Sequence, residues 1–260
     1  MMNESSTYSP QPNYYQTTYT AWYSLFCRIY DLFIRFLFFL INGGFGGAHR
    51  WRQMIVDWVD PRPGKRIIDI CCGTGTLSIM LAQRLAGAGA VAEAELGTGA
   101  RAEAGEGAGQ VVGLELSSDQ LRAARRKPNP GGLTFLEGDA RSLPFPQGHF
   151  DKGVICGALH EMPAEARHRV LTEAHRVIRS DGRMVFIEQH QPKNRLKRSA
   201  WDLLERLNPE YPTYRDLMRR GLIDEIKRGG FRVARSRVIA RGFFQIVLGE
   251  KRKEMTSDVH

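Results

Sequence analysis

The residues with the clearest chemistry lie in one stretch, 66–76, which reads R-I-I-D-I-C-C-G-T-G-T. A short apolar run containing Asp69 is followed by Gly73 and Gly75, with one residue between the two glycines. This order predicts a buried strand, a tight turn and the N-terminus of a helix. Glycine tolerates positive φ and has no Cβ, so a bound ligand can lie directly on the backbone. The stretch therefore predicts a site for a nucleotide-like ligand.

Two kinds of nucleotide-like ligand compete for this site. The dinucleotide-binding fingerprint would place a third glycine where this chain has Ser78. Asp69 lies four residues before the first glycine, and an acid there suits a ligand with a cationic amino group near the strand end. That description fits S-adenosylmethionine better than a pyrophosphate.

Short motifs recur along residues 30–190. They are Y-D (30–31), H-R-W-R (49–52), I-I-D-I-C-C-G-T-G-T (67–76), G-L-E-L-S (113–117), E-G-D-A-R-S-L-P-F (137–145), H-F-D (149–151) and E-A-H-R-V-I-R-S-D-G-R (173–183). With these motifs the chain resembles the class I S-adenosylmethionine-dependent methyltransferases, and within them the ubiquinone/menaquinone biosynthesis C-methyltransferase family. The resemblance implies S-adenosylmethionine as the cofactor and a small, hydrophobic methyl acceptor such as a demethylated quinone.

The candidate cofactor-binding residues follow the ends of predicted strands, because ligands of open α/β sheets bind outside the carboxyl ends of the strands. Glu115 ends the second strand, where its carboxylate can accept both ribose hydroxyls, although the family more often has aspartate there. The resemblance places Asp139 at the adenine amino group. The full set is Asp69, Gly73, Thr74, Gly75, Glu115, Leu116, Asp139, Ala140 and Cys156.

One candidate catalytic residue, His160, lies in the segment G-A-L-H-E-M-P (157–163) that follows the fourth strand. The acceptor and the reactive methyl group should meet there. Histidine titrates near neutral pH, so His160 can take a proton from a phenol or an amine. A histidine that only packs against the strand end is the alternative. Other members of the family have a different residue here, which leaves the acceptor open.

No metal site is expected. The HExxH pattern would need histidine where this chain has Ala164, and Pro163 interrupts the helix that the pattern requires. The four cysteines, at positions 27, 71, 72 and 156, lack paired CxxC spacing. We therefore expect reduced thiols in a cytoplasmic protein.

Alternating elements must position these residues. Strands are expected at 66–70, 111–115, 133–139, 152–158 and 183–188, with helices after Thr76, at 118–126 and at 164–178, and a hairpin of 232–239 and 243–248 closes the chain. The alternation predicts an α/β fold, a Rossmann-like doubly wound sheet that is mostly parallel, with a C-terminal antiparallel hairpin and helices on both faces.

The predicted organisation has one catalytic domain. It divides the chain into a disordered tail (1–19), N-terminal cap helices (20–60), a methyltransferase domain (61–250) and a second tail (251–260). Within the domain, residues 86–110 form a low-complexity Ala/Gly/Glu insertion that cannot bury a core, and residues 191–228 form a helical lid.

Residues 20–42 form a predicted helix whose apolar run is interrupted by Arg28, Asp31 and Arg35. A bilayer-spanning helix of about 20 apolar residues would resist these charges. Two readings stay open: a cap over the acceptor pocket, or an interfacial helix that touches a membrane peripherally.

Composition excludes few classes of function. A net charge of +9 is compatible with an anionic surface, but the basic residues show no nucleic-acid-binding signature, and the polar N-terminus is not a secretory signal. The favoured reading is methyl transfer to a small hydrophobic acceptor. The alternatives are N- or O-methylation of a lipid headgroup or other metabolite, and a non-catalytic S-adenosylmethionine-binding scaffold.

Overall fold

The fold is that of a computed structural model, which describes residues 36, 47–96, 109–206, 208 and 210–251, without the side chains of 88–96. The predicted tail at 1–19, nearly all of the predicted helix at 20–42 and nearly all of the predicted C-terminal tail lie outside the described residues.

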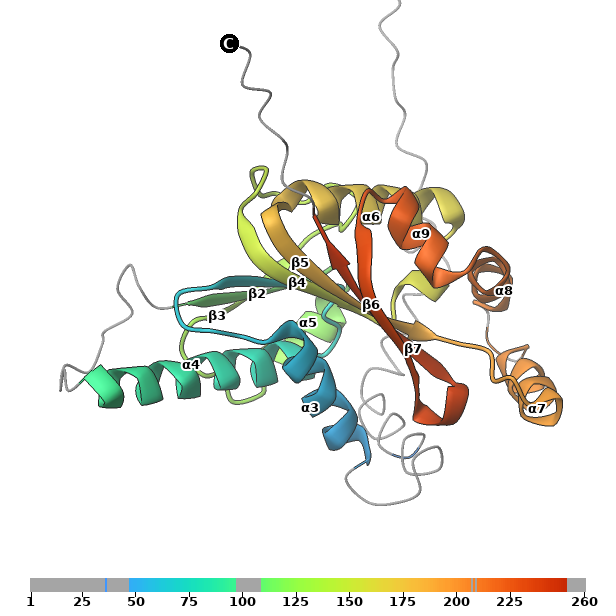
Figure 1. The fold of residues 1–260 in the computed structure, drawn as a ribbon, viewed down its shortest axis with the longest axis horizontal. Coiled ribbons are helices and arrows are strands. Elements are labelled where there is room, and N and C mark those ends of the chain that lie inside the picture. The colour runs from blue at the N-terminus through green and yellow to red at the C-terminus, as the bar shows by residue number, and fades with distance from the viewer. Residues whose placement is uncertain (1–35, 37–46, 97–108, 207, 209, 252–260) are drawn as a thin grey trace, which may run out of the picture.

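The described strands form one seven-stranded sheet in the order β3-β2-β1-β4-β5-β7-β6 (Figure 1). The strands are β1 (Arg66–Ile70), β2 (Gln110–Glu115), β3 (Leu133–Glu137), β4 (Phe150–Cys156), β5 (Ile178–Gln189), β6 (Arg232–Ile239) and β7 (Phe244–Glu250). The first five pair in parallel, and β7 pairs antiparallel with both β5 and β6. The predicted fold class, including the C-terminal hairpin, is confirmed.

Helices cover both faces of this sheet (Figure 1). They are α3 (Gly47–Val59), α4 (Thr76–Leu96), α5 (Ser118–Arg125), α6 (Ala164–Val177), α7 (Arg195–Glu205), α8 (Tyr211–Arg220) and α9 (Leu222–Arg228), with a short 3-10 helix η1 (Leu159–Glu161) after β4 and another, η2 (Ala240–Gly242), before β7. None of the helices in the described part of the chain is long and apolar enough to cross a bilayer.

Alternation along β1 builds a separate core on each face. Ile67 packs with Ile55 of α3 and Leu81 of α4 on one side. Its neighbour Ile68 packs with Leu171 of α6 on the other side, because successive side chains of a strand point to opposite faces. Both faces of the parallel strands are therefore buried, as the apolar runs in the sequence indicate.

The structure refines the predicted insertion at 86–110. Helix α4 continues without a break through residues 86–96, and Gln110 already belongs to β2. Residues 97–108 lie outside the described part of the chain. The predicted lid segment, residues 191–228, contains three helices: α7 and α8 follow β5, and α9 packs against α6 and β6.

Candidate active site

The turn after β1 requires glycine at two positions. Gly73 has φ of +58° and Gly75 has φ of +72°, in the region that L side chains rarely adopt. A Cβ atom on Gly75 would lie 2.5 Å from Cζ of Phe135, and one on Gly73 would lie 2.9 Å from Oε1 of Gln120. The backbone of this loop therefore carries no side chain at positions 73 and 75.

Cys71 begins the same turn with φ of +60°, which is unusual for a residue with a side chain. A left-handed conformation costs roughly 1–2 kcal/mol in a residue other than glycine. The amide of Cys72 donates to the carbonyl of Leu114 at 3.0 Å and holds the turn against β2. Strained backbone of this kind clusters at ligand sites.

Glu115 ties the end of β2 to the glycine turn. Its Oε2 accepts from the amide of Gly73 at 3.0 Å, and its Oε1 accepts from the amides of Leu116 and Ser117 at 3.0 and 2.9 Å. A carboxylate has about four acceptor positions, so this geometry leaves one of them, on Oε2, for a ligand. Burial raises the pKa of Glu115, although the three amides oppose the rise.

Asp69 is almost completely buried at the end of β1. It is 1% exposed, and its Oδ2 accepts from the hydroxyl of Ser78 at 2.6 Å. Burial raises the pKa of Asp69 to about 7, against the hydrogen bond from Ser78. A nearby cation favours the charged form of a carboxylate, so a cationic ligand group would keep Asp69 ionised.

In the third predicted segment, which follows β3, the carboxylate of Asp139 is paired with another side chain of the protein. Both carboxylate oxygens of Asp139 accept from the guanidinium of Arg141, Oδ1 at 3.0 Å and Oδ2 at distances down to 2.6 Å. Burial alone raises the pKa of Asp139, but Arg141 brings it below its ordinary value. Ala140 beside it is buried, while Leu116 after β2 is 38% exposed and offers an apolar surface.

Thr74 is buried between the two loop glycines, and Cys156 lies at the carboxyl end of β4. Burial raises the pKa values of the Cys71, Cys72 and Cys156 thiols, so these groups stay neutral. Neutral thiols are poor nucleophiles and poor metal ligands. The three cysteines pack against the two hydrophobic cores, and a contact between Cys156 and the cofactor stays a prediction.

These strand ends fit the expected cofactor. The bare glycine turn precedes the N-terminus of α4, and the carboxylate of Glu115 faces the same turn. Backbone without Cβ atoms lets a ligand approach closely, and the remaining acceptor of Glu115 can meet a ribose hydroxyl. The residues present can therefore hold S-adenosylmethionine.

A second group of polar residues surrounds His160, which lies on η1 directly after β4. Its Nδ1 atom is 2.8 Å from Oε2 of Glu188, near the end of β5, and Oε1 of the same carboxylate accepts from the amide of Leu159 at 2.6 Å. His160 is 7% exposed and Glu188 is fully buried. Glu188 therefore fixes both the ring and the backbone turn that carries it.

The surroundings of His160 favour its charged form. Burial by itself lowers the pKa of His160, but the charge and hydrogen bond of Glu188, with the charges of Glu161 and Glu210, raise it to about 10. This shift favours the imidazolium, a cation and hydrogen-bond donor, at neutral pH. The expected role of His160 as a proton acceptor stays a prediction.

More carboxylates line this group. Oε2 of Glu210 lies 4.0 Å from Nε2 of His160, and the ligand atoms of His160, Glu161 and Glu210 lie within 4.8 Å of one another. Glu205 of α7 is 7% exposed and interacts electrostatically with His160. This set differs from the HExxH pattern, and the absence of a metal stays a prediction.

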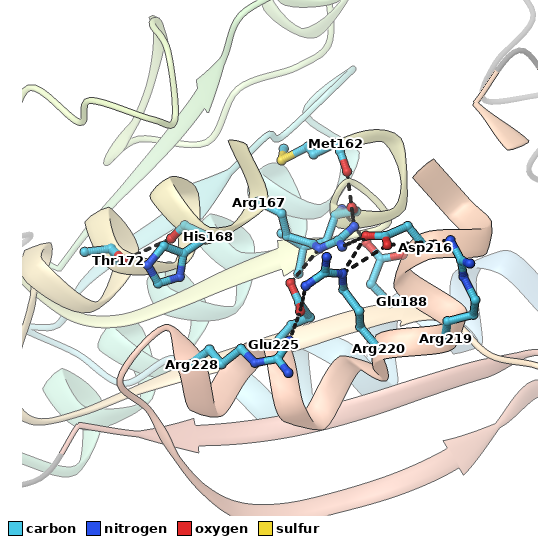
Figure 2. Close-up of polar contacts among 11 residues, drawn as sticks. Met162, Arg167, His168, Thr172, Glu188, Asp216, Arg219, Arg220, Glu225 and Arg228 are labelled. Carbon is cyan, nitrogen blue, oxygen red and sulfur yellow. Dashed lines mark hydrogen bonds and ion pairs between the residues drawn. The ribbon is translucent and has the colours of Figure 1, made fainter. Parts of the chain in front are cut away.

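A buried arginine joins the His160 turn to the lid helices (Figure 2). Arg167 of α6 is fully buried, and it donates to Glu225 of α9 at 2.8 Å and to Asp216 of α8 at 2.7 Å. Its Nη1 donates to the carbonyls of Leu159 and Met162, at 3.3 and 3.1 Å. Arg167 thereby fixes both ends of η1 against α8 and α9.

Four residues around His160 were not among the sequence-based candidates: Arg167, Glu188, Glu205 and Glu210. Glu188 carries the same signal as Glu115, an acid at the carboxyl end of a parallel strand, and could have been found by it. Arg167 is a charged residue on the apolar face of α6, in line with Val170, Leu171 and Ala174. Glu210 offers no comparable signal.

The sequence of this chain matches a known protein family. The ubiE/COQ5 methyltransferase family matches residues 41–210. An uncharacterized methyltransferase of Synechocystis sp. is 28% identical over 91% of this chain and 98% of its own length. A demethylmenaquinone methyltransferase of Thermus thermophilus is 34% identical over 63% of this chain and 62% of its own length, so the match spans under two thirds of that protein.

A solved SAM-dependent methyltransferase from Methanosarcina mazei has the same fold, with a TM-score of 0.54, 18% identity and coverage of 77% of this chain and 98% of that one. The expected fold, enzyme class and cofactor are confirmed, with S-adenosylmethionine as methyl donor. The chain belongs to the ubiE/COQ5 methyltransferase family.

Proposed function

We propose that the protein transfers a methyl group to a ring carbon of a hydroxylated aromatic acceptor, such as the reduced form of a demethylated quinone. One observation carries the proposal: the His160–Glu188 pair, at 2.8 Å, lies at the carboxyl ends of β4 and β5, and the glycine turn lies at the carboxyl end of the neighbouring strand β1. A relative named demethylmenaquinone methyltransferase supports this class of acceptor.

When bound, S-adenosylmethionine supplies an electrophilic methyl group, and the chain's own residues prepare the acceptor. The His160 imidazolium donates from Nε2 to the acceptor oxygen, which favours the phenolate and makes the neighbouring ring carbon more nucleophilic. Glu188 holds the proton on Nδ1. Glu210, 4.0 Å from Nε2, is placed to receive the hydroxyl proton.

Methyl transfer forms a bond from the ring carbon to the methyl group as the sulfur–methyl bond breaks. The methylated ring carbon then releases its proton to water, so the ring regains its aromaticity, and the acceptor oxygen takes the hydroxyl proton back from Glu210. Positioning supplies much of the rate of such in-line reactions, because it removes the entropy cost of bringing two groups together. In this site, Arg167 and Glu188 do the positioning by fixing the η1 turn.

The test is a mass-spectrometric assay with purified protein and S-adenosylmethionine carrying a labelled methyl group. Reduced demethylmenaquinone should gain the label on carbon. Phosphatidylethanolamine, offered in a parallel reaction, tests methylation of a lipid headgroup. Label on the amine and none on the quinol would reject the proposal in favour of that alternative.

A finer prediction concerns place in the cell. A lipid-soluble acceptor is reached at a membrane surface, so we propose a cytoplasmic protein with peripheral membrane contact. The predicted helix at residues 20–42, a candidate for that contact, lies outside the described residues apart from Phe36.

A further inference from the structure

Helix α7 leaves an apolar face exposed. Leu196 is 82% exposed, Leu203 66% and Leu204 53%, and Ala200 between them is also exposed. Spacings of four, seven and eight residues bring these positions to one side of an α-helix. Single exposed leucines are ordinary, but a stripe along one helix marks an interaction surface. We name these four residues the α7 face.

The border of the α7 face is basic. Exposed Arg195, Lys197 and Arg206 flank the face, and Lys193 and Arg198 are exposed nearby. Asp202 pairs with Arg206 and accepts from the hydroxyl of Tyr211, while Glu205 is buried on the inner side. The outer side of α7 therefore combines exposed leucines with a net positive charge.

The inner side of the same helix reaches the candidate active site. The ring of Trp201 packs on Phe243 with centroids 4.9 Å apart, and the charge of Glu205 interacts with that of His160. Figure 1 shows α7 at the periphery of the molecule, beyond β7. One helix thus separates the exposed leucines from the residues around His160.

We propose that the α7 face docks on an anionic lipid bilayer, with the helix lying in the plane of the interface. A short helix with exposed leucines on one face and cations along its border has the composition of an interfacial helix. Clustered Lys and Arg side chains are drawn to anionic lipid headgroups. The surface is distinct from residues 20–42, and it places the bilayer beside the acceptor site. That last consequence rests on the proposed function.

Co-sedimentation with vesicles tests the docking. Vesicles of phosphatidylglycerol and phosphatidylcholine in equal parts should pellet the full-length protein, and binding should weaken in phosphatidylcholine alone and at high salt. The double variant Leu196→Gln/Leu203→Gln should lose about tenfold in binding for each leucine. Val238→Gln, at a residue 47% exposed on β6, is the matched control and should bind like the wild type.

Several outcomes would overturn the proposal. The wild type could stay in the supernatant, or the leucine variant could bind as tightly as the wild type, which would assign binding to charge alone. Self-association that the leucine variant abolishes, without vesicle binding, would assign the face to a second copy of the chain. The assay contains no acceptor, so its failure is separate from failure of the proposed reaction. Calorimetry with S-adenosylmethionine should give equal affinities for wild type and variants, which shows that each is folded.

Discussion

Nδ1 of His160 and Oε2 of Glu188 lie 2.8 Å apart in a buried setting, although 28 residues separate them in the chain. One residue follows β4 and the other lies near the end of β5, strands that pair in parallel. Burial lowers the pKa of His160, but Glu188, with the charges of Glu161 and Glu210, raises it from 6.5 to about 10. The charge state of His160 therefore depends on the pairing of β4 with β5, which brings Glu188 beside it.

The first prediction concerns the pH dependence of methyl transfer. Glu188→Gln keeps a hydrogen-bond acceptor but removes the charge, so the pKa of His160 should fall from about 10. If the imidazolium is the active form, the rate constant falls as pH rises through this pKa. The fall should occur at lower pH in the variant, as measured by kcat profiles. Glu165→Gln, at an exposed residue, is the control. A rate that rises with pH through the same range would instead identify His160 as a base.

A second prediction concerns stability and pH. The pKa of His160 is higher in the folded protein, about 10, than its ordinary value of 6.5, so the folded state holds the proton more tightly. The resulting stabilisation is complete below pH 6.5 and is lost as pH rises through 10. The difference in the free energy of unfolding between wild type and His160→Gln should therefore be larger near pH 6 than near pH 10. Denaturant unfolding measures it, and a difference independent of pH would contradict the charge assignment.

Cofactor binding should depend on Glu115. Glu115→Ala removes three backbone hydrogen bonds and the remaining acceptor, and we expect S-adenosylmethionine affinity to fall by about 1.5 to 3 kcal/mol. Glu137→Ala is the matched control, because Glu137 stands opposite Glu115 on β3 and is exposed. Calorimetry showing equal losses in both variants would remove Glu115 from the site.

Replacing Gly75 and Gly87 with alanine should change the stability of the protein in opposite directions. Gly75→Ala puts a methyl group against Phe135 at positive φ, so stability should fall by more than about 1 kcal/mol and cofactor affinity should drop. Gly87 lies in α4 with nothing near its missing Cβ, so Gly87→Ala should raise stability by about 0.5–1 kcal/mol. Thermal unfolding checks both, and similar effects would show that the turn does not require glycine.

The last prediction concerns Arg167. Arg167→Met removes the buried guanidinium that pairs with Glu225 and leaves only the more exposed Arg228 and Arg220 beside this carboxylate, so we expect the unfolding free energy to fall by about 3 kcal/mol. It also frees the turn that carries His160, so kcat should fall more than cofactor affinity. Arg169→Met is the control, because its ion pair with Glu165 is exposed and contributes at most about 1 kcal/mol. Equal stability of the two variants would show that the buried network contributes little.

The sequence alone determined the parallel sheet, the glycine turn and the position of Glu115, because each depends on local pattern. Apolar runs of strand length set β1 and β2, and Gly73 and Gly75 are demanded by backbone geometry within their own turn. The same local reading could have found Glu188, since it ends a strand as Glu115 does.

Only the tertiary structure decided the charge of His160, the burial of Arg167 and the exposure of the α7 face. Arg167 meets Glu225 across 58 residues of chain, and Glu210 reaches His160 from the lid. Such pairs depend on how helices pack after β5, which no short-range pattern specifies. An apolar stripe on a helix, likewise, predicts burial by its periodicity, and only the packed arrangement shows that Leu196 and Leu203 remain on the outside.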